Sequence, residues 1–283
     1  MPLTPANARI FVLANASKPH IAEPYGRLTA WLRERGQLVG SECTGRPETV
    51  NESAPDYLIA LGGDGTILHA AQAMGTRQVP IIGVNMGKLG YLADFVEQEI
   101  YQSLDQLLGA DQLISPRMML DVRVVPPAGD PWSGIALNDC VVRVGDPFRT
   151  ITLEVSIDGQ PLCILAGDGV ILATPTGSTA HNMSCGGPIV EPSVHAIIMT
   201  PRCPHSFTHR PVVISDTAQI GIRVLPNSAG ASAVLDGQRI QPVGPNWRIL
   251  VSKSTHVARL VRNPRLRPLD TLITKLKWGA DVT

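Results

Sequence analysis

A short apolar run that leads directly into a glycine-rich loop constrains the fold most. Residues 57–61 read YLIAL, residues 62–66 read GGDGT, and ILHAAQAM follows. An apolar run of this length is typical of a strand that is buried on both faces in a parallel sheet. After the loop, helical spacing places four apolar side chains on one face: Ile67, Leu68, Ala71 and Met74. The segment therefore predicts a strand, a tight turn and a helix.

The first third of the chain repeats this alternation of strand and helix. Residues 10–14 (IFVLA) and 79–84 (VPIIGV) are further apolar runs. Residues 24–35 have helical character, with a proline near the start and a glycine just past the end. Such a rhythm is typical of a parallel sheet covered by helices. We expect residues 1–116 to form a Rossmann-like α/β domain that carries the GGDGT loop.

The pattern changes from about residue 118 to a series of short β-type runs. Gly, Pro, Asn and Asp separate these runs, and the Asp-Gly pairs at 158–159 and 236–237 are typical hairpin turns. We expect residues 117–255 to form a β-sandwich-like domain. Residues 256–283 contain the helical pattern LDTLITKLKW, which we expect to pack back on the first domain. The predicted fold class is therefore α/β plus all-β.

Composition and charge exclude several classes of partner. Lys and Arg total 24, as do Asp and Glu, so the chain lacks the excess positive charge of a general nucleic-acid binder. No apolar run reaches the roughly 18 residues that a membrane span needs, and the N-terminus lacks the pattern of a secretory signal. Five scattered cysteines without a C-x-x-C pair indicate free thiols in a reducing compartment, which we expect to be the cytoplasm, and no metal site.

The GGDGT loop has the composition of a phosphate cradle with a carboxylate inside it. Gly62, Gly63 and Gly65 leave backbone N–H groups bare near a helix N-terminus, which favours phosphate. A carboxylate would repel phosphate there, so Asp64 makes sense if it accepts a proton from an attacking hydroxyl or acts through Mg²⁺. The structural alternative is a tight turn in which Asp64 or Thr66 caps the helix.

A second glycine-rich loop, residues 83–92 (GVNMGKLGYL), follows another predicted strand. Ligands of open α/β sheets bind at the carboxyl ends of the strands, so we expect the two loops to form one crevice. Neither loop matches G-x-G-x-x-G, and no Walker A motif occurs. The ordinary mononucleotide-binding folds are therefore not supported.

Two further polar clusters lie in the β-rich part. Asn138 and Asp139 interrupt the apolar run GIALNDCVVRV, and they mark either a turn or a pair that reads an adenine edge and ribose hydroxyls. Residues 167–169 (GDG) and 174–180 (TPTGSTA) are either a turn-rich loop that opens a helix or a set of hydroxyls that binds a polar ligand. None of the histidines has metal-ligand spacing, and we interpret them as structural except for His181, which directly follows this cluster.

Taken in order, these segments resemble the NAD kinase family. GGDGT alone is also similar to the loop of diacylglycerol and sphingosine kinases, but the combination is specific: LGGDGTILHA, GVNMGKLGYLADF, ALNDCVV and GDGVILATPTGSTAHNMSCGGPI. The resemblance implies a phosphotransferase that moves the terminal phosphoryl group of ATP, or of another donor, to the 2′-hydroxyl of the adenosine ribose of NAD. It also implies Mg²⁺ or another divalent cation, carried with the nucleotide.

The resemblance further implies roles for individual residues. Asp64 matches the proposed general base of the family, and Asp168 matches an acid near the nicotinamide end of the ligand. The phosphate loop is Gly62, Gly63 and Thr66. The residues that the resemblance places around NAD are Gly65, Asn138, Asp139, Asp168, Thr176, Thr179, Ala180 and His181. His181 stands where the family usually has Tyr. The family is usually dimeric or tetrameric through its β domains, which implies a homodimer or homotetramer.

Two other functions share some of these features. A lipid or small-alcohol kinase with the same loop predicts an apolar acyl-binding surface and gives no reason for TPTGSTA. A non-catalytic dinucleotide sensor predicts tight NAD or NADP binding without turnover. The sensor does not explain Asp64, because a carboxylate beside phosphates is costly unless it is used. The motif set therefore favours the NAD kinase.

Overall fold

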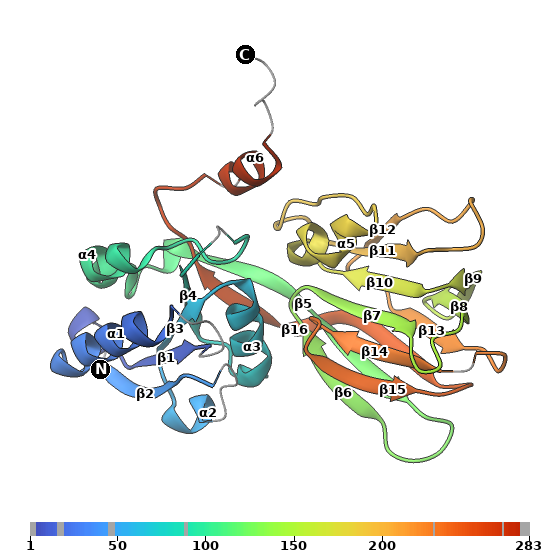
Figure 1. Cartoon of the computed structure of the whole chain (residues 1–283), viewed down its shortest axis with the longest axis horizontal. Coiled ribbons are helices and arrows are strands. Elements are labelled where there is room, and N and C mark those ends of the chain that lie inside the picture. Colours follow the sequence, from blue (N-terminus) through green and yellow to red (C-terminus); the bar gives the residue numbers. More distant parts are fainter. Residues whose placement is uncertain are drawn as a thin grey trace. The chain divides into compact units, whose positions relative to one another are not determined.

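The computed structural model describes residues 4–15, 20–44, 49–87, 90–228, 230–267 and 269–277. The chain forms two compact units (Figure 1). One unit consists of Met1–Pro116 and Ala258–Thr283, and the other of Arg117–Val257. Strands β5 (Ile114–Val125) and β16 (Arg248–Val261) carry the chain from one unit to the other.

A parallel sheet forms the centre of the first unit. Its strands run in the order β2-β1-β3-β4, and the end of β16 pairs with β4. The strands are β1 Ile10–Ala14, β2 Leu38–Glu42, β3 Tyr57–Gly62 and β4 Pro80–Asn85. The α-helices are α1 Ala22–Glu34, α2 Val50–Ser53, α3 Asp64–Met74, α4 Glu97–Leu107 and α6 Asp270–Leu276. Two 3-10 helices are η1 Pro5–Asn7 and η2 Asp111–Leu113.

Helices cover both faces of this sheet. Successive residues of a strand point to opposite sides, so these buried strands present apolar side chains on both faces. Ile59 and Ile82 pack in one core with apolar residues of α1 and α4. Gly83 faces the other side, where α3 lies so close that a Cβ would be 2.5 Å from Ile67 Cδ1. The absence of a side chain at Gly83 therefore lets the helix that follows GGDGT pack directly on the sheet.

The second unit is built from two antiparallel sheets with a common core. One contains β16-β13-β8-β9 with β5 and β6, and the other runs β12-β11-β10-β7-β14-β15. The strands not yet given are β6 Trp132–Ala136, β7 Asp139–Val144, β8 Ile151–Ile157, β9 Gln160–Gly167, β10 Gly169–Ala173, β11 Ala196–Arg202, β12 Val212–Ser215, β13 Ile220–Val224, β14 Ala231–Leu235 and β15 Arg239–Val243. The 3-10 helix η3 (Thr176–Thr179) and the short helix α5 (His181–Ser184) follow β10.

Alternation along the strands separates this core from a second apolar cluster. Cys140 and Val142 of β7 lie in the core that both sheets share. Val141, between them, faces the other way and packs with Ile171 and Val234. The outer face of the sheet that contains β7, β10 and β14 is therefore apolar in its middle. A helix or a ligand can bind against such a face.

The predicted fold class is confirmed, with a parallel α/β sheet in one unit and antiparallel β-sheets in the other. The Asp-Gly pairs at 158–159 and 236–237 connect β8 to β9 and β14 to β15. β16 runs well beyond the apolar run RILVS, because its later residues pair with β4. Among the described residues, no helix is both long and apolar enough to cross a lipid bilayer.

Candidate active site

The GGDGT loop forms the turn between β3 and α3, as the sequence predicts. Gly62 ends β3, Gly63 is the N-cap residue of α3, and Asp64 is its first residue. A Cβ at Gly62 would lie 2.3 Å from Thr66 Oγ1, so the turn leaves no room for a side chain there. Gly65 is exposed, and a Cβ there would meet no atom within 4 Å. Packing therefore does not require a glycine at Gly65.

The Asp64 carboxylate joins the two glycine-rich loops. Its Oδ2 accepts a hydrogen bond from Tyr91 N (2.8 Å), and its Oδ1 accepts one from Leu92 N (3.0 Å). No side chain forms a cap hydrogen bond at the start of α3, so helix capping does not explain Asp64. The two loops therefore meet at this carboxylate. Lys88 and Leu89 of the second loop lie outside the described residues.

Asn138 lies between β6 and β7 and Asp139 is the first residue of β7, and the carboxylate of Asp236 holds the backbone of both. Asp236 Oδ1 accepts hydrogen bonds from Asn138 N (2.7 Å) and Asp139 N (3.1 Å), and Oδ2 accepts one from Leu137 N (2.9 Å). Asp236 N donates to Asp139 O (3.0 Å). Sequence analysis identified Asp236 only as part of a hairpin turn. Its anchoring role was missed because the bonded residues lie 97 to 99 positions away.

The side chains of this pair are buried and incompletely satisfied. Asn138 is 9% exposed and Asp139 is 4% exposed. No described residue donates a hydrogen bond to Asn138 Oδ1. Burial, and secondarily the Asp236 carboxylate, raise the pKa of Asp139 to about 7. A buried acceptor without a donor beside a carboxyl that titrates near neutrality is typical of a site that a ligand completes.

The TPTGSTA segment packs against the backbone of Asn138. A Cβ at Gly177 would lie 2.0 Å from Asn138 O, so only glycine fits. Thr174 Oγ1 donates to Leu137 O (2.6 Å) and accepts from Gly177 N (3.0 Å). Ser178 Oγ donates to a carbonyl within the segment at 2.6 Å. The hydroxyls of Thr174 and Ser178 therefore stabilise the loop. The sequence predicts four hydroxyls as possible ligand contacts in this segment, and these two are already used within the protein.

A pocket of about 230 Å³ gathers several of the predicted residues. Its lining is Asn138, Asp139, Val141, Arg143, Ala180, His181, Val234, Asp236 and Gly237. The sequence-predicted residues Asp168, Thr176 and Thr179 do not line it. Burial, followed by the charges of Arg202 and Arg143, lowers the pKa of His181. The imidazole is therefore neutral at pH 7 and presents a flat, uncharged ring to the pocket.

Asp168 connects β9 to β10 beside a cysteine that sequence analysis did not single out. Asp168 N donates to Arg202 O (3.0 Å), and Asp168 O accepts from Val144 N (3.0 Å). The Asp168 carboxylate accepts a hydrogen bond from the exposed Cys203 thiol and raises the pKa of that thiol. This pairing brings together the β9–β10 connection and the residue that follows β11, so no local sequence pattern could have revealed it.

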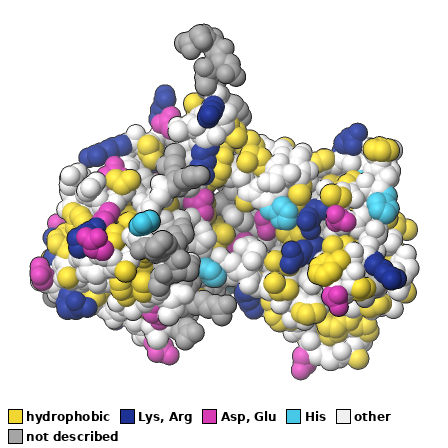
Figure 2. Space-filling model, viewed as in Figure 1, with side chains coloured by type: hydrophobic (Ala, Val, Ile, Leu, Met, Phe, Trp, Pro, Cys, Tyr) yellow, Lys and Arg dark blue, Asp and Glu magenta, His cyan; other side chains and the backbone are white. Residues whose placement is uncertain are grey.

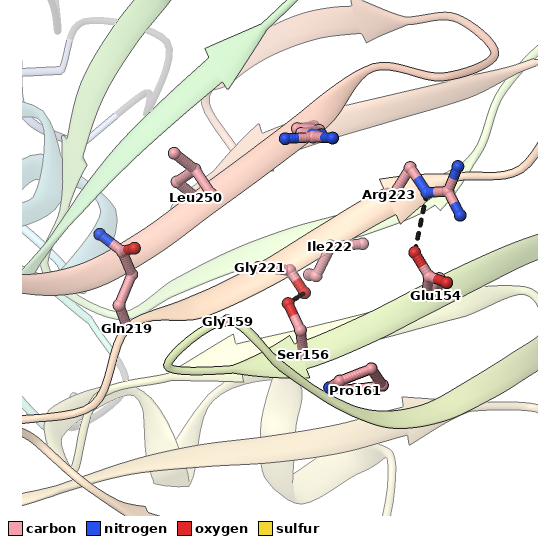
Figure 3. Close-up of a pocket in the computed structure, with 10 residues that line it drawn as sticks. Glu154, Ser156, Gly159, Pro161, Gln219, Gly221, Ile222, Arg223 and Leu250 are labelled. Carbon is pink, nitrogen blue, oxygen red and sulfur yellow. Dashed lines mark hydrogen bonds and ion pairs between the residues drawn. The ribbon is translucent and has the colours of Figure 1, made fainter.

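A larger hollow of about 480 Å³ lies on the outer face of the second unit's other sheet, the one that contains β8, β13 and β16 (Figure 3). There Arg223 Nε donates to Glu154 Oε2 (2.8 Å), and Ser156 Oγ donates to Gly221 O (3.4 Å). None of the sequence-predicted site residues lines this hollow. Because Glu154 and Arg223 neutralise each other, we assign the chemistry to the smaller pocket.

Comparisons with known proteins find relatives of both parts of the chain. Residues 13–112 match the family model of the ATP-NAD kinase N-terminal domain, and residues 137–263 match that of the ATP-NAD kinase C-terminal domain. The chain is 37% identical over 262 residues to the NAD kinase of Solibacter usitatus, which covers 89% of this chain and 91% of that protein. It is 36% identical over 279 residues to the NAD kinase of Geobacter metallireducens, covering 96% and 99%.

Solved structures give a consistent result. The crystal structure of an NAD kinase from Archaeoglobus fulgidus in complex with ATP is similar with a TM-score of 0.77 and 26% identity, covering 95% of this chain and 98% of that one. The crystal structure of yeast NADH kinase complexed with NADH has a TM-score of 0.87 at 23% identity, covering 97% and 89%. At that identity, the yeast structure supports the fold alone.

Proposed function

The chain belongs to the NAD kinase family, and we propose that it transfers the terminal phosphoryl group of ATP, or of another donor, to the 2′-hydroxyl of the adenosine ribose of NAD, which yields NADP. Phosphotransfer to NAD follows from relatives that are similar over their full length. The observation that carries the finer assignment is the pocket in which Asn138 Oδ1 lacks a donor beside the buried Asp139.

In this assignment, the pocket holds the adenosine part of NAD. Asn138 Oδ1 accepts a hydrogen bond from the adenine amino group, and ionised Asp139 accepts hydrogen bonds from ribose hydroxyls. Ala180 and the neutral ring of His181 form the apolar wall against which the base packs. Asp168, Thr176 and Thr179 complete the set of NAD-binding residues.

The GGDGT loop supplies the catalytic and phosphate-binding groups. Gly62, Gly63, Gly65 and Thr66 lie at the start of α3, where the helix dipole favours phosphate. Asp64 accepts the proton of the ribose hydroxyl as that hydroxyl attacks the phosphoryl group. Two backbone N–H groups fix the orientation of this carboxylate, and each oxygen keeps a further lone pair for substrate.

We also propose that Mg²⁺ or another divalent cation enters with the nucleotide. Magnesium in such sites is bound by one or two carboxylates together with substrate phosphates and water, and it neutralises charge on the transferred group. Asp64 fits this requirement, because it is a carboxylate within the phosphate loop. In the described ranges, no three His, Cys, Asp or Glu side chains converge on a common point.

We propose a homodimer or homotetramer in the cytoplasm. β9 ends its sheet, and its apolar Leu162 and Ile164 are exposed. Exposed apolar residues on an edge strand favour association with another chain. All five cysteines are free, which supports a reducing compartment. Light scattering on the purified protein tests the oligomeric state.

One assay tests the reaction. Purified protein is incubated with Mg²⁺, NAD or NADH and a panel of phosphoryl donors, and an NADP-specific dehydrogenase detects the product. We expect NADP from at least one donor, and mass spectrometry should place the added phosphate on the adenosine ribose. Phosphorylation of a lipid or a sugar in place of NAD would overturn the assignment.

A further inference from the structure

Two arginines lie in one row across the outer sheet of the second unit, with a glycine between them. Gly169 of β10 pairs with Arg143 of β7 on one side and with Arg202 of β11 on the other. Directly opposed residues of antiparallel strands share a face of the sheet, so both arginine side chains leave the same face. With strands about 4.8 Å apart, their Cα atoms are separated by roughly 10 Å.

The glycine is required by the backbone and leaves this row open. Gly169 has a φ of 137°, and a Cβ there would lie 2.0 Å from Val142 O. No other residue fits this position, so no side chain fills the space between the two arginines. The row therefore consists of two guanidinium groups flanking bare backbone.

The same face carries the candidate NAD pocket. Alternation along β7 places Asp139, Val141 and Arg143 on the outer face, and all three line the pocket. The pocket is thus acidic at one end, apolar in the middle and basic at the other, over a strand length of about 13 Å. Figure 2 shows basic side chains gathered beside a histidine over β7, β10 and α5.

The two guanidinium groups have no acidic partners in the part of the chain that the structure describes. No carboxylate there lies within 4.0 Å of Arg143 or Arg202. Nε and Nη1 of Arg202 are buried and have no hydrogen-bond acceptor among the described residues. Both charges also lower the pKa of His181. Arg143 is exposed and its charge is solvated, whereas Arg202 is only partly exposed, so the unneutralised charge of Arg202 is costly unless an anion completes the site.

We propose that Arg143 and Arg202 form the receptor for the pyrophosphate of the dinucleotide, so that NAD lies along β7 with its adenosine at Asn138 and Asp139 and its phosphates over Gly169. The choice of NAD as ligand rests on the proposed function. Guanidinium groups match phosphate oxygens with paired N–H donors, which an ammonium group does not. The donor nucleotide also carries phosphates, so the experiment must separate the two sources.

Calorimetry with adenosine and ADP-ribose tests this proposal, because only ADP-ribose carries the pyrophosphate. Arg143→Gln and Arg202→Gln should each weaken ADP-ribose and NAD binding about tenfold and leave adenosine binding within about twofold. Arg202→Lys should give an intermediate loss, since it keeps the charge without the fork. Arg248→Gln, in the hollow of the other sheet, is the matched control and should change none of these affinities.

Three results would overturn the proposal. One is unchanged ADP-ribose affinity in both glutamine variants, with melting temperatures near that of the parent. Another is an equal loss of affinity for adenosine. The third is a rise confined to the KM of ATP at saturating NAD, which would assign the arginines to the donor. Failure of the proposed function gives a different result: ADP-ribose binding that depends on the arginines, without any phosphate added to NAD.

Discussion

A Cβ at Gly90 would lie 2.0 Å from Asp64 Oδ1, so the second glycine-rich loop packs directly against the carboxylate of the first. The next two residues of that loop, Tyr91 and Leu92, donate their N–H groups to the same carboxylate. The orientation of Asp64 therefore depends on a segment more than twenty positions further along the chain.

Gly90→Ala should lower kcat about 100-fold with the fold and NAD affinity retained. The added methyl group must displace either the Asp64 carboxylate or the loop, and a shift of about 1 Å near the reacting atoms costs this much. Gly87→Ala is the matched control, because a Cβ at Gly87 meets no atom within 4 Å. Equal turnover of the two variants in the coupled NADP assay would show that this close contact does not limit catalysis.

Asp64→Asn should bind NAD normally and lose about 10²–10⁴-fold in kcat, because it cannot accept a proton. The amide also supplies one oxygen where two N–H groups need acceptors, so we expect a loss of roughly 1–3 kcal/mol in stability. Turnover, NAD affinity and melting temperature measured on this one variant test both effects. Turnover within a few-fold of the parent would remove Asp64 from the mechanism.

The parts of the site that the sequence predicted are those encoded in one continuous segment. GGDGT was predicted as a strand, turn and helix because the apolar runs on either side of it are local patterns. The hydrogen bonds that orient Asp64 could not be predicted, since they come from a separate loop. The row of Arg143 and Arg202 was equally hidden, because it depends on the register of three strands.

Asp236→Ala should raise the KM for NAD at least about tenfold and lower stability by roughly 1–3 kcal/mol. It removes the acceptor for three consecutive N–H groups, two of which belong to Asn138 and Asp139. Asp158→Ala is the matched control, because Asp158 occupies the same position in another Asp-Gly hairpin and has a similar positive φ. Equal KM values in the two variants would reduce Asp236 to a turn residue.

His181→Tyr should keep or improve NAD affinity, whereas His181→Ala should weaken it several-fold. The neutral imidazole lines the pocket as a flat wall, and a phenol ring offers more area to a stacked base. Calorimetric titration of NAD into both variants provides the measurement. If both bind NAD as the parent does, His181 does not contact the ligand.

Asp139 should make the free energy of unfolding fall as pH rises from about 4 to about 7. Burial and the Asp236 carboxylate raise its pKa in the folded protein to about 7 from an ordinary value of 3.8. Within this window the folded state holds a proton that the unfolded state has released, so raising the pH favours unfolding. The stabilising contribution is complete below about pH 4 and is lost above about pH 7.

Asp139→Asn cannot ionise, so it should gain stability relative to the parent across this range in urea titrations. Parallel pH profiles for the two proteins would contradict the raised pKa of Asp139, because titration of groups that do not interact with Asp139 cancels in the difference.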